Sequence, residues 1–231
     1  MAVSKRIRLV MFDCDGTLVD SQDMIHHSVA AAFTRHGRPA PDKEAVKRIV
    51  GLPLVGAMAR LWPEASPEDC EAIGGYYKEA FQTLRAGGNV HEPLFPGVRE
   101  TLATLEADGY LLGVATGKSR RGLHATLTLH DLMDHFTILQ TSDDAPGKPH
   151  PGMLENAMLE MGMDKAEMVF VGDTTFDIEM ARNAGVAGVG VSWGYHPAGD
   201  LEAAGASTIL GRFEDVISAI RELGEGHEAF L

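Results

Sequence analysis

Short apolar runs separated by segments of helical periodicity are the feature that most constrains how this chain of 231 residues can fold. Such alternation indicates βαβ units, because parallel strands need a long crossover, which is usually a helix. We therefore expect an α/β fold with a Rossmann-like parallel sheet. The expected strands are residues 7–12, 111–116, 136–140, 168–172 and 187–191, followed by an edge strand at 207–210 and a closing helix at 213–223.

The segment from Asp23 to about residue 88, which lies between the first two expected strands, has no strand signal and is dominated by helical patterns. Prolines and glycines divide it into helical segments joined by short turns. Because the first strand belongs to the same sheet as the later ones, these helices form an insertion, with joints near Ser21 and residues 87–89. The chain is thus divided into an α/β core of residues 1–20 and 89–231 and an α-helical cap domain of residues 21–88. The expected cap helices are residues 24–36, 43–49, 54–61 and 67–85.

Acidic side chains outnumber basic ones, 33 to 20, which gives a formal net charge of -13. This charge disfavours nucleic acid and anionic membrane surfaces as partners, whereas a small anionic substrate needs only a local group of cations. No apolar stretch reaches about 18 residues, so a membrane span is not expected. Two cysteines without metal-ligand spacing, and an amino-terminal segment without a cleavage site, favour a reduced, cytoplasmic location.

Two carboxylates come directly after the first expected strand, at Asp13 and Asp15. Open α/β sheets bind ligands at the carboxyl ends of their strands, so we expect Asp13 to be presented to a ligand rather than buried. A helix cap would need only one such acid, and two like charges this close are costly unless a cation neutralises them. Gly16 permits the sharp turn after these acids.

Polar groups also occur at the ends of the later strands. Thr116 and Gly117 end the second expected strand, where a hydroxyl and a main-chain amide can hold phosphate oxygens. Lys148 lies among prolines in a loop rigid enough to aim its side chain, and Asp173 and Asp177 come after the fourth expected strand. Taken alone, such a threonine more often just ends a strand, and such a lysine more often points to solvent. Together these residues would place donors and acids at one edge of the sheet.

The acids suit Mg²⁺, which prefers a few carboxylates and keeps positions for water and substrate phosphate. Asp13, Asp173 and the main-chain carbonyl of Asp15 are the expected ligands. Asp177 is either a further ligand or a residue that supports the site by pairing with Lys148, and its spacing does not decide between these roles.

Four motifs occur in a fixed order: DxDGT at residues 13–17, Thr-Gly at 116–117, a lone lysine before proline at 148–149, and GDxxxD at 172–177. The ordered set resembles the haloacid dehalogenase superfamily of phosphohydrolases, in the subgroup with an α-helical cap, and the motif sequences are similar to those of phosphoglycolate phosphatases. The resemblance implies a sheet with strand order 5-4-1-2-3, numbered along the chain, and a cap inserted after the first strand.

The resemblance also implies a Mg²⁺-dependent phosphatase that hydrolyses small phosphorylated metabolites through an aspartyl-phosphate intermediate. Asp13 would be the nucleophile, and Asp15 would be the general acid and base. Thr116, Gly117 and Lys148 would bind the phosphoryl group, while Mg²⁺ would shield Asp13 from the anionic substrate.

The cap would select the substrate, and it offers few clear signals. Arg48, Gly51 and Arg60 are the candidates for contacts with the leaving group, although a turn glycine and solvated surface cations would look the same in the sequence. Residues 193–196, WGYH, either line the crevice or pack against the edge of the sheet.

Other functions share parts of this pattern. A sugar-phosphate mutase would use the same nucleophile but return the phosphoryl group to its substrate, and a pyrophosphatase would use the same site. A non-catalytic receiver-like signalling module also becomes phosphorylated on an aspartate at a strand end. A receiver, however, needs about half this length and no lid.

Overall fold

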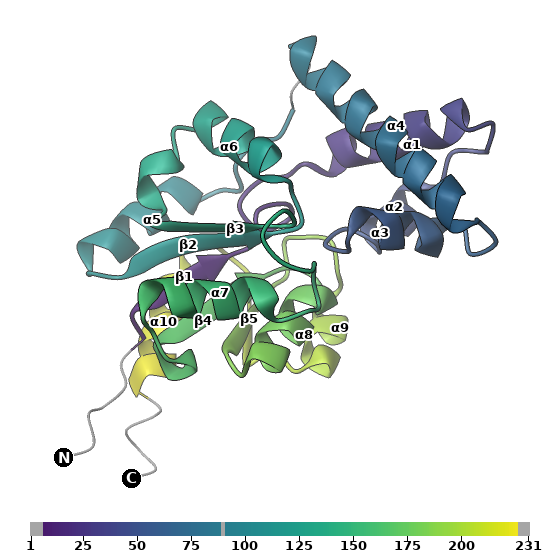
Figure 1. The fold of residues 1–231 in the computed structure, drawn as a ribbon. Helices are drawn as coiled ribbons and strands as arrows, with labels where there is room; N and C mark the ends of the chain where they lie inside the picture. Colours follow the sequence, from purple (N-terminus) through teal and green to yellow (C-terminus); the bar gives the residue numbers. More distant parts are fainter. Residues whose placement is uncertain (1–6, 89–90, 226–231) are drawn as a thin grey trace.

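A six-stranded parallel sheet forms the centre of the larger part of the molecule (Figure 1). The computed structural model describes residues 7–88 and 91–225. The strands are β1 (Leu9–Phe12), β2 (Leu111–Thr116), β3 (Ile138–Thr141), β4 (Met168–Gly172), β5 (Ala187–Val191) and β6 (Thr208–Leu210). Within the described residues the strand order is β3-β2-β1-β4-β5-β6, and every neighbouring pair is parallel. The strands from β5 to β3 thus have the predicted order 5-4-1-2-3, and β6 adds an edge beside β5.

Helices cover both faces of the sheet, which explains why its strands read as continuous apolar runs. Alternate residues of β1 enter different cores, with Val10 and Phe12 on one face and Leu9 and Met11 on the other. The first face is covered by α5 (Val98–Ala107), α6 (Arg120–Leu129) and α10 (Asp215–Glu225). The second is covered by α7 (Gly152–Met161), α8 (Thr175–Ala184) and α9 (Ala198–Ala204). Short 3₁₀ helices lie at Met133–His135 and Lys165–Glu167.

The first four helices after β1 pack on one another beside the sheet (Figure 1). They are α1 (Gln22–Arg35), α2 (Lys43–Lys47), α3 (Leu54–Leu61) and α4 (Pro67–Ala86). We call α1 to α4 the helical unit. Residues of all four helices share one apolar core, which Tyr195 of the α/β part also joins. The longest helix of the unit begins with a capping box at Ser66 and a proline in its first turn.

The expected elements are all present, with shifts at some ends. Several ends shift by two residues, and one of them is the end of α2, which lies at Lys47 and not at residue 49. There the main-chain bonds tighten, because Ile49 N–H donates to Val46 and Val50 N–H donates to Lys47, three residues back, as the chain turns toward Gly51. Part of the joint predicted at residues 87–89 lies outside the described residues, and the division into cap and core stays a prediction.

Among the described residues, none of the helices combines the length and the apolar character that crossing a membrane requires.

Candidate active site

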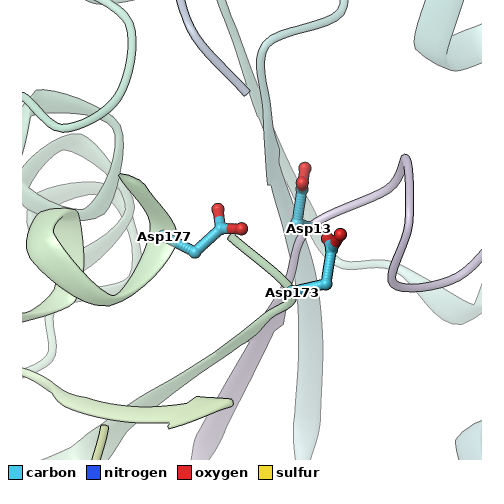
Figure 2. Close-up of side chains that lie close together, drawn as sticks. All are labelled: Asp13, Asp173 and Asp177. Atoms are coloured by element: carbon cyan, nitrogen blue, oxygen red, sulfur yellow. The ribbon is translucent and has the colours of Figure 1, made fainter. Parts of the chain in front are cut away.

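Three acids and a lysine meet at the carboxyl edge of the sheet. Asp13 follows β1 and Asp173 follows β4, and these strands are neighbours that pair Phe12 with Val171. Asp177 lies in the first turn of α8. One carboxylate oxygen from each of these acids lies within 4.8 Å of the others (Figure 2). Residues 160 positions apart in the chain therefore form one acidic cluster.

Lys148 is the cation of this cluster. Its Nζ lies 2.7 Å from Asp13 Oδ1 and 2.7 Å from Asp177 Oδ1, and the side chain is 0% exposed. Burial lowers the pKa of Lys148, but the two carboxylates outweigh that effect, so its pKa lies above the usual value. The lysine therefore stays charged inside the protein, where an unpaired ammonium would be strongly unfavourable.

Asp13 is 2% exposed, so the expectation that it would not be buried was wrong. The reason is that Lys148, Asp173 and Asp177, themselves completely buried, crowd around it. Burial raises the pKa of Asp13 to about 7, with Lys148 opposing the shift and Asp177 adding to it. Its Oδ1 is held by Lys148, whereas Oδ2 has no hydrogen bond or ion pair within the described residues.

Asp173 is enclosed by two loops. Thr17 Oγ1 donates to its Oδ1 at 3.0 Å, and Tyr195 N–H donates to its Oδ2 at 2.9 Å. The DxDGT turn approaches so closely that a Cβ at Gly16, whose φ is +83°, would lie 2.1 Å from Asp173 Oδ2. Burial, and then the charges of Asp177 and Asp13, raise the pKa of Asp173 well above its usual range.

Asp177 serves both the helix and the lysine. Thr174 donates to Asp177 Oδ2 from its N–H at 2.9 Å and from its hydroxyl at 2.7 Å, while Asp177 N–H donates back to Thr174 Oγ1, which completes a capping box. Asp177 Oδ1 holds Lys148. Asp177 Oδ2 thus accepts two hydrogen bonds and Oδ1 faces an ammonium, and whether Asp177 also binds a metal stays a prediction.

The cluster can hold a divalent cation. Three carboxylates and one ammonium carry a formal charge of -2 in a buried space, and such a charge calls for a counter-ion. Carboxylate oxygens are the ligands that Mg²⁺ prefers. Asp13 and Asp173 offer the oxygens with fewer strong partners.

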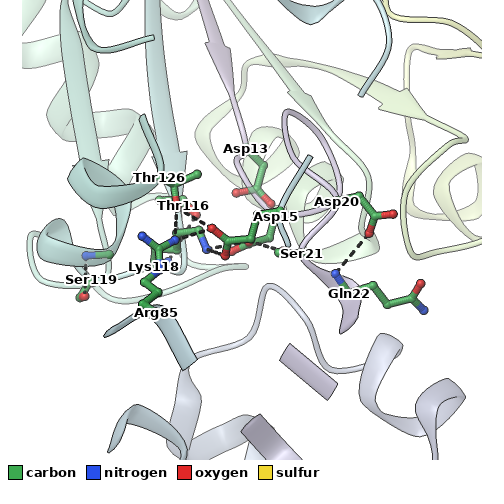
Figure 3. Close-up of polar contacts among 12 residues, drawn as sticks. Asp13, Asp15, Asp20, Ser21, Gln22, Arg85, Thr116, Lys118, Ser119 and Thr126 are labelled. Atoms are coloured by element: carbon green, nitrogen blue, oxygen red, sulfur yellow. Dashed lines mark hydrogen bonds and ion pairs between the residues drawn. The ribbon is translucent and has the colours of Figure 1, made fainter. Parts of the chain in front are cut away.

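Asp15 points into a different network (Figure 3). Ser21 Oγ donates to Asp15 Oδ1, and Lys118 Nζ lies 2.8 Å from the same oxygen. The hydroxyl of Tyr195 accepts a hydrogen bond from Ser21 N–H at 3.2 Å. The two acids of the DxDGT turn thus have separate partners, although they stand two residues apart.

Sequence reasoning assigned no role in the site to Lys118 or Ser21, and it considered Tyr195 only as one of residues 193–196. Lys118 comes directly after Thr116 and Gly117, and that position was the one local signal for it. Thr116 is buried at the end of β2, and its Oγ1 accepts a hydrogen bond from Lys118 N–H at 3.3 Å. Figure 3 shows Thr116 close to Lys118 and Asp15.

Residues 193–196 show both of the behaviours that the sequence left open. The ring of Trp193 packs against Phe213 and Phe95, at centroid distances of 5.6 Å and 6.3 Å. Tyr195 instead reaches the site through its N–H and its hydroxyl.

A loop of the helical unit covers this edge of the sheet. A Cβ at Gly51, whose φ is +95°, would lie 3.2 Å from Thr174 Oγ1. A Cβ at Gly117 would lie 3.6 Å from the Gly51 carbonyl oxygen, and one at Gly147 would lie 2.7 Å from Pro53 Cγ. Residues 51–53 therefore rest on three of the loops that carry the motifs.

Arg48 and Arg60 do not line the acidic cluster. They line a pocket of about 390 Å³ at the boundary between the helical unit and the α/β part, and none of the clustered acids lines it. Arg48 Nη1 pairs with Asp200 of α9 at 2.5 Å. The prediction that these arginines contact a leaving group stays a prediction. The other lining residues are Thr175, Phe176, Glu179, His196 and Asp200.

A parallel sheet with acids and a buried lysine at its carboxyl edge, together with a helical insertion after the first strand, is the arrangement of a haloacid dehalogenase-like hydrolase. The chain belongs to the haloacid dehalogenase-like hydrolase family, whose model matches residues 10–191. This match includes all four motifs and confirms the family that they resemble.

Individual relatives agree with this family along nearly the whole chain. The probable phosphatase IndB of Dickeya dadantii is 37% identical over 218 residues, which cover 93% of this chain and 94% of IndB. The phosphoglycolate phosphatase of Photorhabdus laumondii is 32% identical over 227 residues, with 94% of each chain covered. A haloacid dehalogenase-like hydrolase of Streptococcus pneumoniae has a similar structure, with a TM-score of 0.81 at 25% identity, covering 92% of this chain and 98% of that one.

Proposed function

We propose that this protein is a Mg²⁺-dependent phosphatase that hydrolyses small phosphate monoesters through an aspartyl-phosphate intermediate, and that phosphoglycolate-like esters are its first candidate substrates. The observation that carries the proposal is the state of Asp13. Lys148 holds one oxygen of its buried carboxylate, and the other oxygen has no partner within the described residues.

Asp13 would act as the nucleophile. Its Oδ2 would form a bond to phosphorus while the bond from phosphorus to the leaving oxygen breaks, which divides the hydrolysis into two easier displacements. Lys148 fixes the orientation of the carboxylate by holding Oδ1. A Mg²⁺ ion held by Asp13 and Asp173 would supply positive charge that offsets the repulsion between the carboxylate and the anionic substrate.

Asp15 would act as the general acid and then as the general base. It would give a proton to the leaving oxygen in the first step and take one from the attacking water in the second. Ser21 and Lys118 hold its Oδ1 and so orient the carboxylate. The Thr116 hydroxyl, the Gly117 amide and Lys148 would supply fixed donors to the phosphoryl oxygens.

The helical unit would act as a lid. Its loop at residues 51–53 already rests on the motif loops, where it would exclude water from the first step. Gly51 is then the first residue that a leaving group meets. A leaving group long enough to pass this loop would reach Arg48 and Arg60 in the neighbouring pocket.

A panel of phosphorylated compounds, assayed with Mg²⁺ and with EDTA, tests the proposal. The panel should contain 2-phosphoglycolate, pyrophosphate, nucleoside monophosphates and hexose phosphates. We expect phosphate release that requires Mg²⁺ and falls by about a hundredfold or more in Asp13→Asn, because covalent catalysis is lost. The matched control is Asp134→Asn at an exposed position, which should keep wild-type activity.

Equal turnover by the wild type and Asp13→Asn would contradict the proposal. A strong preference for pyrophosphate would favour the pyrophosphatase, and phosphoryl exchange between hexose phosphates without release of phosphate would favour the mutase.

A further inference from the structure

Glu92 is a buried carboxylate that lies beside the site and takes no part in the proposed phosphoryl transfer. Its side chain is 0% exposed. Arg85 of α4 pairs with its Oε2, and Thr126 Oγ1 of α6 donates to the same oxygen at 3.3 Å. Its Oε1 has Lys118 Nζ, at 3.6 Å, as its charged neighbour among the described residues. Glu92 thus joins a cation of the helical unit to a cation of the α/β part.

These contacts continue to Asp15. Lys118 stands between two carboxylates, 2.8 Å from Asp15 Oδ1 and 3.6 Å from Glu92 Oε1. Arg85, Glu92, Lys118 and Asp15 therefore form a row of alternating charges (Figure 3 shows its two cations and Asp15). All four side chains are at least four-fifths buried, so each depends on its neighbour for charge compensation.

The helical unit contributes more than Arg85 to this row. Lys118 Nζ lies 5.3 Å from the ring centroid of Phe81, one turn before Arg85 in α4, and the Arg85 guanidinium lies 5.4 Å from the same centroid. Arg85 also donates to Thr126 Oγ1 at 2.6 Å. The position of Lys118 therefore depends on how α4 is seated.

We propose that Glu92 is a positioning residue that couples the seating of the helical unit to the orientation of Asp15, through Lys118. While Arg85 neutralises Glu92, Lys118 stays closer to Asp15 and holds it. If α4 moves away, Glu92 loses Arg85, and Lys118 becomes its nearest cation among the described residues. Lys118 is then drawn toward Glu92 and releases Asp15. This inference rests on the proposed function, because it gives Asp15 its role as the general acid.

Leaving-group chemistry provides a readout that a merely structural residue would not change. In the first step Asp13 forms its bond to phosphorus, the bond to the leaving oxygen breaks, and the proton of Asp15 passes to that oxygen. An alkoxide needs this proton, whereas 4-nitrophenolate is stable without it. The value of kcat/KM reports only the steps up to formation of the intermediate. A misplaced Asp15 should therefore lower kcat/KM for alkyl esters and leave kcat/KM for the aryl ester nearly unchanged.

The experiment compares kcat/KM for 4-nitrophenyl phosphate with kcat/KM for the alkyl phosphate that the wild type hydrolyses best. Glu92→Gln preserves shape but removes the second carboxylate that fixes Lys118, so Lys118 no longer holds Asp15 in one orientation. We expect the alkyl ester to slow by about tenfold or more, and the aryl ester by about threefold or less. The control is Glu100→Gln, an exposed glutamate of α5, which should change neither value.

Arg85→Met tests the same row from the helical unit and should cause the same selective loss, since it leaves Glu92 to compete for Lys118. If the row acts as one unit, the double variant should be no worse than the poorer single variant. Thermal unfolding of each variant checks that it is folded.

Two results would overturn the inference. One leaves the proposed function intact, and the other removes it as well. If the wild type is an active phosphatase and the variants lose kcat/KM equally for the alkyl and aryl esters, or lose none, the role of Glu92 alone is removed. A wild type that hydrolyses neither ester would remove it together with the proposed function.

Discussion

The ammonium of Lys148 lies fully buried between the carboxylates of Asp13 and Asp177. A cation in this position is stable only because two anions compensate it, and the anions in turn depend on the cation. The balance is incomplete, because Asp173 adds a third buried acid. Burial, and then the charges of Asp177 and Asp15, raise the pKa of Asp13 to about 7 against the opposing effect of Lys148, and a bound divalent cation would lower it again.

The metal-free protein should therefore lose stability through Asp13 as the pH rises. The pKa of Asp13 rises on folding from 3.8 to about 7, so the folded state binds the proton more tightly, and the stabilisation present below pH 4 is lost as the pH passes 7. We expect the free energy of unfolding of the wild type, relative to Asp13→Asn, to fall by a few kcal/mol over this range in EDTA.

Urea unfolding of both proteins between pH 4 and pH 8 measures this difference. Mg²⁺ should restore the stability of the wild type near pH 8 and have a smaller effect on Asp13→Asn. A difference that does not change with pH would contradict the expectation.

At the scale of elements, the site is assembled where strands end and helices begin. β1 and β4 are neighbours, so the turns at their carboxyl ends bring Asp13 and Asp173 together. The start of α8 adds Asp177, whose carboxylate caps the helix through Thr174 and also holds Lys148. The same contact thus stabilises an element and positions a charged group.

Thr174→Val should affect both the cap of α8 and the position of Lys148. The substitution keeps the shape of the side chain but removes the hydroxyl that donates to Asp177 Oδ2 at 2.7 Å and accepts from Asp177 N–H. We expect the free energy of unfolding to fall by about 1–2 kcal/mol, together with lower phosphatase activity, because Asp177 then holds Lys148 less firmly. Thr174→Ser, which keeps the hydroxyl, should retain most of both properties, and urea unfolding and ester hydrolysis measure them. A Val variant as stable and active as the Ser variant would contradict the prediction.

At the scale of the whole molecule, the helical unit and the α/β part meet through the loop at residues 51–53, through the Arg85–Glu92 pair and through a more exposed ion pair. Arg48 of the helical unit lies 2.5 Å from Asp200 of α9, with side chains that are 55% and 44% exposed. An ion pair in contact with solvent contributes at most about 1 kcal/mol. It can therefore bias the closure of the helical unit without locking it.

Removing this pair should weaken substrate binding only slightly. For Arg48→Gln we expect KM to rise by about fivefold or less at low salt, with a smaller change at high salt, because screening already weakens the pair there. The double exchange Arg48→Asp with Asp200→Arg should restore the low-salt KM. Arg38→Gln, which alters an arginine that stacks on Trp62 elsewhere in the helical unit, is the control. A change in KM that is independent of salt would show that Arg48 acts by other means.

The amino-acid sequence by itself determined the strands of the sheet, the helical insertion and the motif residues Asp13, Thr116, Lys148 and Asp173, whereas the strand order followed from the family that the motifs resemble. These depend on local patterns, because apolar periodicity specifies an element and the carboxyl edge of a parallel sheet gathers the residues at the end of each strand. The tertiary structure alone decided that Asp13 is buried, that Lys148 bridges two acids and that Asp15 has partners of its own. It also revealed Glu92, for which no local pattern exists. Its partners lie in α4, in α6 and in the loop after β2. Only folding brings these groups into one buried, low-dielectric space, where each charge needs a neighbour of opposite charge.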